Sequence, residues 1–226
     1  MTARTGKRLF IDIETVPTQR VELAEYVQQS LKPPGNYKNE EAINKWLAEN
    51  QDKAFRSTAL DGAFGELVVL SYAIDDGPVF GTYRDIKRRD EGEYLRQIWS
   101  DLAEEASDVG LIWVGHKLMF DMLFLHQRSI VTGARPSLRI PYMDRPWAGT
   151  WEDTNALWTG NDRLGDSVSL DKLCMALSIP SPKDGIDGSQ VWDAIQAGDY
   201  ESVVKYNVAD VEATREVYRR LTGWGA

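Results

Sequence analysis

The stretch Leu9-Phe10-Ile11-Asp12-Ile13-Glu14 decides the expected fold of this 226-residue chain. It is a short apolar run that ends in acidic residues, which predicts a buried strand. Residues two apart in a strand point to the same face, so Asp12 and Glu14 are expected side by side. Two carboxylates in that position repel each other unless a divalent cation, which prefers oxygen ligands, lies between them. A strand end that emerges into solvent would explain the pair equally well.

Elements predicted on either side of this strand give an α/β domain. Strands come early, and helices first alternate with them and then dominate, which predicts a mixed central sheet flanked by helices. Residues 18–65 are long for a connection between adjacent strands, and they predict a helical insertion over the sheet edge. The remaining expected strands are residues 66–74, 79–83, 111–114 and 138–142, and the expected helices are residues 21–31, 39–51, 91–106, 120–130, 169–177, 189–197 and 201–221.

Composition limits the class of protein. The length and the 42% hydrophobic content predict one domain over residues 1–226. The net charge of −9 counts against a protein that coats nucleic acid by charge alone. A single cysteine, Cys174, and the lack of a long apolar run predict a cytoplasmic protein with no membrane contact. The basic run at residues 87–89 indicates either a solvated face or a patch that contacts phosphates.

Two later segments supply further acidic residues. Tyr206 and Asp210 are four apart and share one face of a predicted helix. Asp121 follows the predicted strand at residues 111–114 and falls in the first turn of the next helix. An ordinary polar helix face and a favourable interaction with the helix dipole are the simpler explanations. Together with Asp12 and Glu14, however, these residues give four carboxylates and a tyrosine at one edge of the sheet.

The same segments resemble the DEDD exonuclease superfamily. Residues 10–15 (FIDIET) match its Asp-x-Glu-Thr motif, and residues 115–121 (GHKLMFD) resemble its Gly-His-Asn-x-x-Phe-Asp motif. Residues 206–210 (YNVAD) match the Tyr-x-x-x-Asp form of the third motif, which defines the tyrosine (DEDDy) subclass. The histidine subclass would need His at position 205, which is Lys. Residues 170–174, 179–180 and 183–192 are also similar to stand-alone bacterial and phage exonucleases related to the family-B DNA polymerase proofreading domain.

This resemblance implies a ribonuclease H-like fold and a 3′→5′ exonuclease that uses two divalent cations, Mg²⁺ or Mn²⁺. It implies that Asp12, Glu14, Asp121 and Asp210 bind the metals and that Tyr206 orients the attacking water. Contacts to the substrate are expected from Ile13, Thr15, Lys117 and Phe120, although Phe120 is equally compatible with core packing. Lys117 departs from the family, which usually has Asn at this position.

The expected substrate is the 3′ end of single-stranded DNA or a frayed 3′ end, in a bacterial or phage-infected cell. Proofreading would require a replication or repair partner in trans. Two other functions stay open: an exoribonuclease of the same fold, for which single-strand loops and the 2′-hydroxyl would matter, and a non-catalytic nucleic-acid-binding module.

Overall fold

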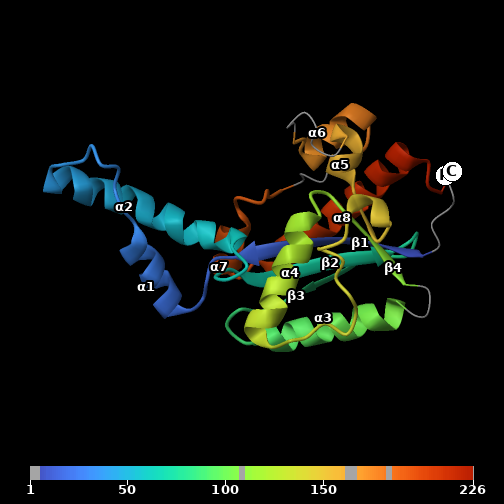
Figure 1. Ribbon diagram of the computed structural model, residues 1–226, viewed down its shortest axis with the longest axis horizontal. Coiled ribbons are helices and arrows are strands. Elements are labelled where there is room, and N and C mark those ends of the chain that lie inside the picture. The colour runs from blue at the N-terminus through green and yellow to red at the C-terminus, as the bar shows by residue number, and fades with distance from the viewer. Residues whose placement is uncertain (1–5, 107–109, 161–166, 182–184, 226) are drawn as a thin grey trace.

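The computed structural model describes residues 6–106, 110–160, 167–181 and 185–225 (Figure 1). Lys183 and Asp184, part of the stretch compared with the exonucleases above, lie outside the described residues. None of the helices in the described ranges is both long and apolar enough to cross a membrane.

A five-stranded mixed sheet forms the centre of the molecule, in the order β3-β2-β1-β4-β5. The central strand β1 (Lys7–Val16) pairs antiparallel with β2 (Glu66–Ile74), which pairs antiparallel with β3 (Phe80–Tyr83). On its other side, β1 pairs parallel with β4 (Leu111–Gly115), which pairs parallel with β5 (Trp151–Asp153). The C-terminal ends of β1, β4 and β5 therefore lie at the same edge of the sheet.

Helices cover both faces of this sheet, as predicted (Figure 1). On one face, α3 (Glu91–Ala106) and α4 (Met119–Thr132) pack against the apolar residues of β1. On the other face, α8 (Tyr200–Thr222) packs along β1, β2, β3 and β4, and its Tyr218 hydroxyl donates a hydrogen bond to Glu152 of β5. The side chains of β1 alternate accordingly: Leu9, Ile11 and Ile13 face α3 and α4, whereas Phe10 packs in the cluster that contains Val211 of α8.

The predicted insertion between β1 and β2 is helical. It contains α1 (Val21–Ser30), α2 (Glu40–Ser57) and a 3-10 turn (Thr58–Leu60). The Asn39 side chain caps α2, as its position predicts, by accepting the Glu41 N–H at 2.9 Å. Neither α1 nor α2 has a fully buried residue. Figure 1 shows both helices projecting beyond the end of the sheet as an arm, instead of lying over its edge.

The predicted strand at residues 138–142 is wrong. That segment is irregular, and the fifth strand is β5, which begins at Trp151. Ile140 is buried and Leu138 packs against the same core cluster, so these apolar residues cover the core from a loop. Pro136 lies shortly before the segment and Pro141 lies within it, and neither has the N–H that a strand ladder needs. A three-residue strand is too short to show an alternating pattern.

Three shorter helices complete the fold: α5 (Thr154–Thr159), α6 (Leu170–Leu177) and α7 (Val191–Ala197). The first of these was not predicted. The arm is fixed to α7 by an ion pair of 2.8 Å between Arg56 and Asp193 and by the Phe55 and Trp192 rings, whose centroids lie 6.0 Å apart.

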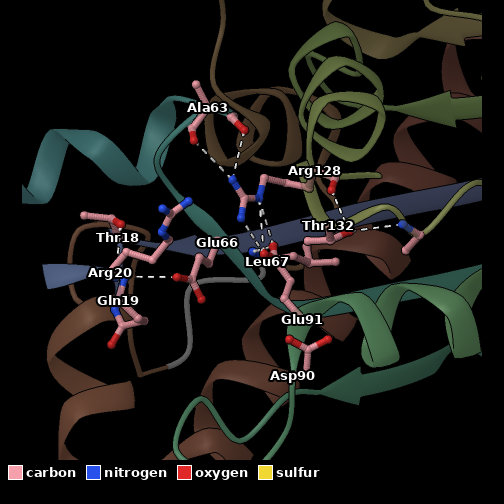
Figure 2. Close-up of polar contacts among 12 residues, drawn as sticks. Thr18, Gln19, Arg20, Ala63, Glu66, Leu67, Asp90, Glu91, Arg128 and Thr132 are labelled. Carbon is pink, nitrogen blue, oxygen red and sulfur yellow. Dashed lines mark hydrogen bonds and ion pairs between the residues drawn. The ribbon is translucent and has the colours of Figure 1, made fainter. Parts of the chain in front are cut away.

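Two buried ion pairs hold β2 to its neighbours, and Figure 2 shows the one between Arg128 and Glu91. The Arg128 guanidinium of α4 pairs with the Glu91 carboxylate of α3 at 2.5 Å, and Glu91 also accepts the Leu67 N–H of β2 at 2.7 Å. Arg84, which follows β3, pairs with Glu66 at 2.7 Å. These side chains are almost fully buried, so each charge depends on its partner.

We expect Arg128→Met to lower the free energy of unfolding by about 3–5 kcal/mol, because it leaves the Glu91 carboxylate buried without its partner. Arg220→Met, which removes an exposed ion pair with Glu216, should change it by less than about 1 kcal/mol. Urea denaturation followed by circular dichroism measures both. Equal losses in the two variants would contradict this role for the buried pair.

Candidate active site

Three carboxylates from two distant parts of the chain meet at the centre of the sheet. Asp12, Glu14 and Asp210 each offer an oxygen atom, and these atoms lie within 4.8 Å of one another. Asp12 and Glu14 project from the same face of β1, the face that α8 covers. Asp210 is buried on α8. The structure therefore brings together three of the four carboxylates that the sequence predicted at one edge of the sheet.

The close approach of α8 to the sheet depends on Gly81 of β3. A Cβ atom at this position would lie 2.7 Å from a methyl group of Val208 and 2.8 Å from one of Val204. Both distances are too short for ordinary side-chain contacts. A larger residue at position 81 would therefore push away the helix that carries Tyr206 and Asp210.

Asp121 reaches the site from the opposite face of the sheet. It is buried in the first turn of α4, and its Oδ1 accepts the backbone N–H of Ile13 at 3.2 Å. Ile13 lies between Asp12 and Glu14 in β1, so this hydrogen bond holds Asp121 against the strand that carries the acidic pair. The group of oxygen atoms within 4.8 Å does not include Asp121.

Burial and neighbouring negative charges raise the pKa values of Asp12, Glu14 and Asp121. Burial is the largest cause for Asp12 and Glu14, and the charges of the neighbouring carboxylates add to it. Burial also raises the pKa of Asp121 to about 8, against the opposing effect of its backbone hydrogen bonds. A site made only of crowded carboxylate oxygens fits a hard divalent cation, which would remove the repulsion.

Asn207 is a site residue that the sequence reasoning missed. Its side chain is fully buried, and its Nδ2–H donates to Asp12 Oδ2 at 2.5 Å. Its Oδ1 has no hydrogen-bond partner among the described residues. A buried acceptor without a partner costs about 1–3 kcal/mol, and the hydration shell of a cation beside Asp12 would satisfy it. The signal was present in the sequence as a polar residue among Val203, Val211 and the other buried positions of this helix.

Tyr206 lies half-buried one helical turn before Asp210. Burial raises the pKa of its phenol well above the usual value, and the negative charges of Asp210 and Glu14 raise it further. The hydroxyl therefore keeps its proton at neutral pH. It is suited to donating a hydrogen bond and not to accepting a proton from water.

Lys117 has a strained backbone, with φ of 60°. This left-handed conformation is uncommon for a residue with a side chain, and Asn tolerates it better than Lys. The Lys117 side chain is exposed, and among the described residues it forms no ion pair with the acidic cluster. Its backbone N–H donates to Asp153 Oδ1 at 3.0 Å.

Asp153 is a second positioning residue that the sequence reasoning missed. Besides the Lys117 N–H, its Oδ1 accepts the Asn155 N–H at 2.8 Å and caps α5. It thereby fixes the turn between β4 and α4, which leads to Asp121. The missed signal was an acidic residue directly before a short helix. It was overlooked because the fifth strand was expected elsewhere.

The other three residues expected to contact the substrate, Ile13, Thr15 and Phe120, lie in different environments. Ile13 has its side chain in the core, with 6% exposed, so only its backbone faces the acids. The Thr15 hydroxyl donates to the Ala59 carbonyl at 2.7 Å, which ties β1 to the 3-10 turn of the arm. Phe120 is 37% exposed, and its ring centroid lies 5.6 Å from that of Phe124. Their contact with a substrate stays a prediction.

Without divalent cations, we expect the thermal midpoint to fall as the pH rises from about 4 to about 8. The folded chain keeps a proton on Asp121 up to its pKa of about 8, whereas an unfolded Asp loses it near pH ~4. Raising the pH in this window therefore favours the unfolded chain. In buffers that contain EDTA, the thermal midpoint of the Asp121→Asn variant should fall less steeply with pH than that of the native protein. Identical slopes for the two proteins would show that Asp121 is not the source.

We also expect Lys117→Asn to stabilise the protein by up to about 1 kcal/mol, because Asn relieves part of the left-handed backbone strain. Lys117→Arg, which keeps the charge and the strain, should leave the free energy of unfolding unchanged. Urea denaturation distinguishes the two. A gain in both variants would point to the side chain instead of the backbone.

Comparison with known proteins identifies the family. A family described as predicted 3'-5' exonuclease related to the exonuclease domain of PolB matches residues 63–224, well over half of the chain. The match includes Asp121, Tyr206 and Asp210, whereas Asp12 and Glu14 precede it. No curated protein matches the chain. With the mixed five-stranded sheet, the match confirms the expected ribonuclease H-like fold and the exonuclease resemblance. The chain belongs to the family of predicted 3'-5' exonucleases related to the exonuclease domain of PolB.

Proposed function

We propose that this exonuclease hydrolyses the terminal phosphodiester at the 3′ end of single-stranded DNA, or at a frayed 3′ end, with two divalent cations, Mg²⁺ or Mn²⁺. The observation that carries the proposal is the set of three carboxylate oxygens within 4.8 Å, from Asp12, Glu14 and Asp210. The Asp121 carboxylate, which accepts the backbone N–H of Ile13, is the fourth acid of the site. Burial and the neighbouring charges raise the pKa values of Asp12 and Glu14, so the ionised site is costly to keep without a cation.

Each residue has a role in this proposal. Asp12, Glu14, Asp121 and Asp210 would hold the cations, and Asn207 orients Asp12 through its Nδ2–H. Two bound cations would supply the positive charge that stabilises the attacking and the leaving oxygen atoms. Tyr206, which keeps its proton, donates a hydrogen bond that orients the attacking water.

Contact with the 3′-terminal base is assigned to Phe120. This side chain is partly exposed and directly precedes Asp121, so a base stacked on it would bring its phosphate close to the acids. The backbone of Ile13, Thr15 and the exposed Lys117 side chain are further contacts in this proposal. Stacking on a ring does not distinguish DNA from RNA.

A non-catalytic binding module is the less well supported function. Such a module gains nothing from four acids at one site, and each buried carboxylate lowers its stability. An exoribonuclease would use the same acids, so the two nucleic acids must be compared directly. Parallel digestion of DNA and RNA oligonucleotides of one sequence makes that comparison, and faster loss of the RNA would replace DNA as the proposed substrate.

We expect Asp12→Ala and Asp210→Ala to lower the rate of degradation of a 5′-labelled single strand in Mn²⁺ by roughly a thousandfold, because charge stabilisation of this kind is worth several kcal/mol. Glu212→Ala, an exposed acid on the same helix, is the matched control and should retain full activity. Tyr206→Phe should slow the reaction by roughly 10–100-fold while retaining Mn²⁺ binding.

Strands blocked at the 3′ or the 5′ end test the polarity. We expect a 3′ block to stop degradation and a 5′ block to have no effect. Undiminished hydrolysis by both Asp variants, or degradation that ignores the 3′ block, would overturn the proposal.

A further inference from the structure

A cavity of about 550 Å³ lies where β2 begins and β3 ends, beside the start of α3 and the end of α4. Its walls carry twice as many cationic as acidic side chains, in a chain whose net charge is −9. This concentration of positive charge is unlike the composition of the protein as a whole. The cationic residues of this basic cavity are Arg20, Arg84, Lys87, Arg88, Arg89 and Arg128.

The acids of the cavity are already engaged by other groups (Figure 2). Glu66 accepts the Gln19 N–H at 3.0 Å and pairs with Arg84, as described above. Glu91 is held by Arg128 and the Leu67 N–H. Asp90 caps α3 by accepting the Glu93 N–H at 3.1 Å. The two buried arginines are therefore balanced by two acids, and Arg20 pairs with Glu22 at 2.6 Å. The charge of Lys87, Arg88 and Arg89 is left without a strong partner among the acids of the cavity.

The other three cations, Lys87, Arg88 and Arg89, lie on the turn between β3 and α3. Lys87 is exposed and forms no ion pair among the described residues. The Arg88 side chain is 86% exposed and lies 3.5 Å from Asp85. Arg89 is half-buried, and its guanidinium carbon lies 5.2 Å from the centre of the Tyr94 ring. Exposed cations with weak or no partners are available to an anionic ligand.

This turn is fixed relative to the active site. The Asp85 carbonyl accepts the N–H of Arg89 at 2.9 Å, and the Tyr200 hydroxyl accepts the Ile86 N–H at 3.2 Å. Tyr200 is the first residue of α8, whose later residues Tyr206 and Asp210 belong to the active site. At 1.5 Å per residue, the turn lies about 9–15 Å along the helix axis from them. The cavity is also at the same end of the sheet, because Glu66 pairs with Val16, two residues after Glu14.

We propose that the basic cavity binds backbone phosphates of the substrate strand, on the 5′ side of the bond that is cut. At about 3.4 Å per stacked nucleotide, the separation corresponds to roughly three to four nucleotides from the 3′ end. Recognition is by charge and is independent of base sequence, whether the phosphodiester belongs to DNA or RNA. By contrast, the cavity beside α5 carries Glu152 and Asp153 and would repel a phosphate. This inference rests on the proposed exonuclease function.

The test compares two variants with the same loss of charge. Lys87→Gln/Arg88→Gln removes two exposed cations of the cavity. Arg219→Gln/Arg220→Gln removes two from the last turn of α8, about 30 Å along the helix from Tyr200. Fluorescence anisotropy of a labelled twelve-nucleotide DNA strand in EDTA gives the affinity at several NaCl concentrations. Thermal midpoints confirm that both variants fold.

We expect the slope of log K against log[NaCl] to become shallower by about 1.4 in the cavity variant, or about 0.7 for each lost phosphate contact. The control variant should keep the slope of the native protein. The gain in affinity on lengthening the strand from two to eight nucleotides should be lost only in the cavity variant. An unchanged slope, or equal changes in both variants, would overturn the inference. Because binding is measured without divalent cations, a failure of the catalytic proposal would appear separately, as native protein that binds but does not cut.

Discussion

Repulsion among carboxylates is the interaction on which the rest of the structure depends. One oxygen atom from each of Asp12, Glu14 and Asp210 lies within 4.8 Å of the others, and burial and the neighbouring charges raise the pKa values of Asp12 and Glu14. The fold opposes this repulsion with apolar packing of β1 on both faces and with buried ion pairs at its C-terminal end. The stability of the scaffold is thus used to maintain an arrangement that a cation relieves.

The residues that bear charge at the site were predictable, because like charges at strand and helix spacing stand out in an apolar context. β1, α8 and the insertion helices followed from periodicity and capping residues in the same way. Asp153 and Asn207 each had a local sequence signal, but their partners, Lys117 and Asp12, could not be inferred from spacing because they lie far away in the chain. The β5 strand was missed because three residues are too few to show an alternating pattern. The apolar residues of the loop around Ile140 were instead interpreted as a strand.

Positive and negative charge are separated over a short distance in this acidic protein. The acids gather where β1 meets α8, and the exposed cations gather on the turn before α3. Because α8 connects the two through Tyr200, Tyr206 and Asp210, the spacing between them is set by one rigid element. The net charge of −9 is consequently a poor guide to whether the protein binds a nucleic acid strand, because the charges are distributed unevenly.

The contact between Asn207 and Asp12 has a consequence for folding. These residues are 195 positions apart, so their hydrogen bond closes almost the whole chain into a loop. Contacts of such separation form slowly, because the entropy of closing the loop is lost before they contribute stability. Local helices and the β2–β3 hairpin can form first, while Asp210 is still far from Asp12 and Glu14. Asp210 reaches the acidic pair only when α8 packs on β1, through the same contact that buries Phe10 and Val211.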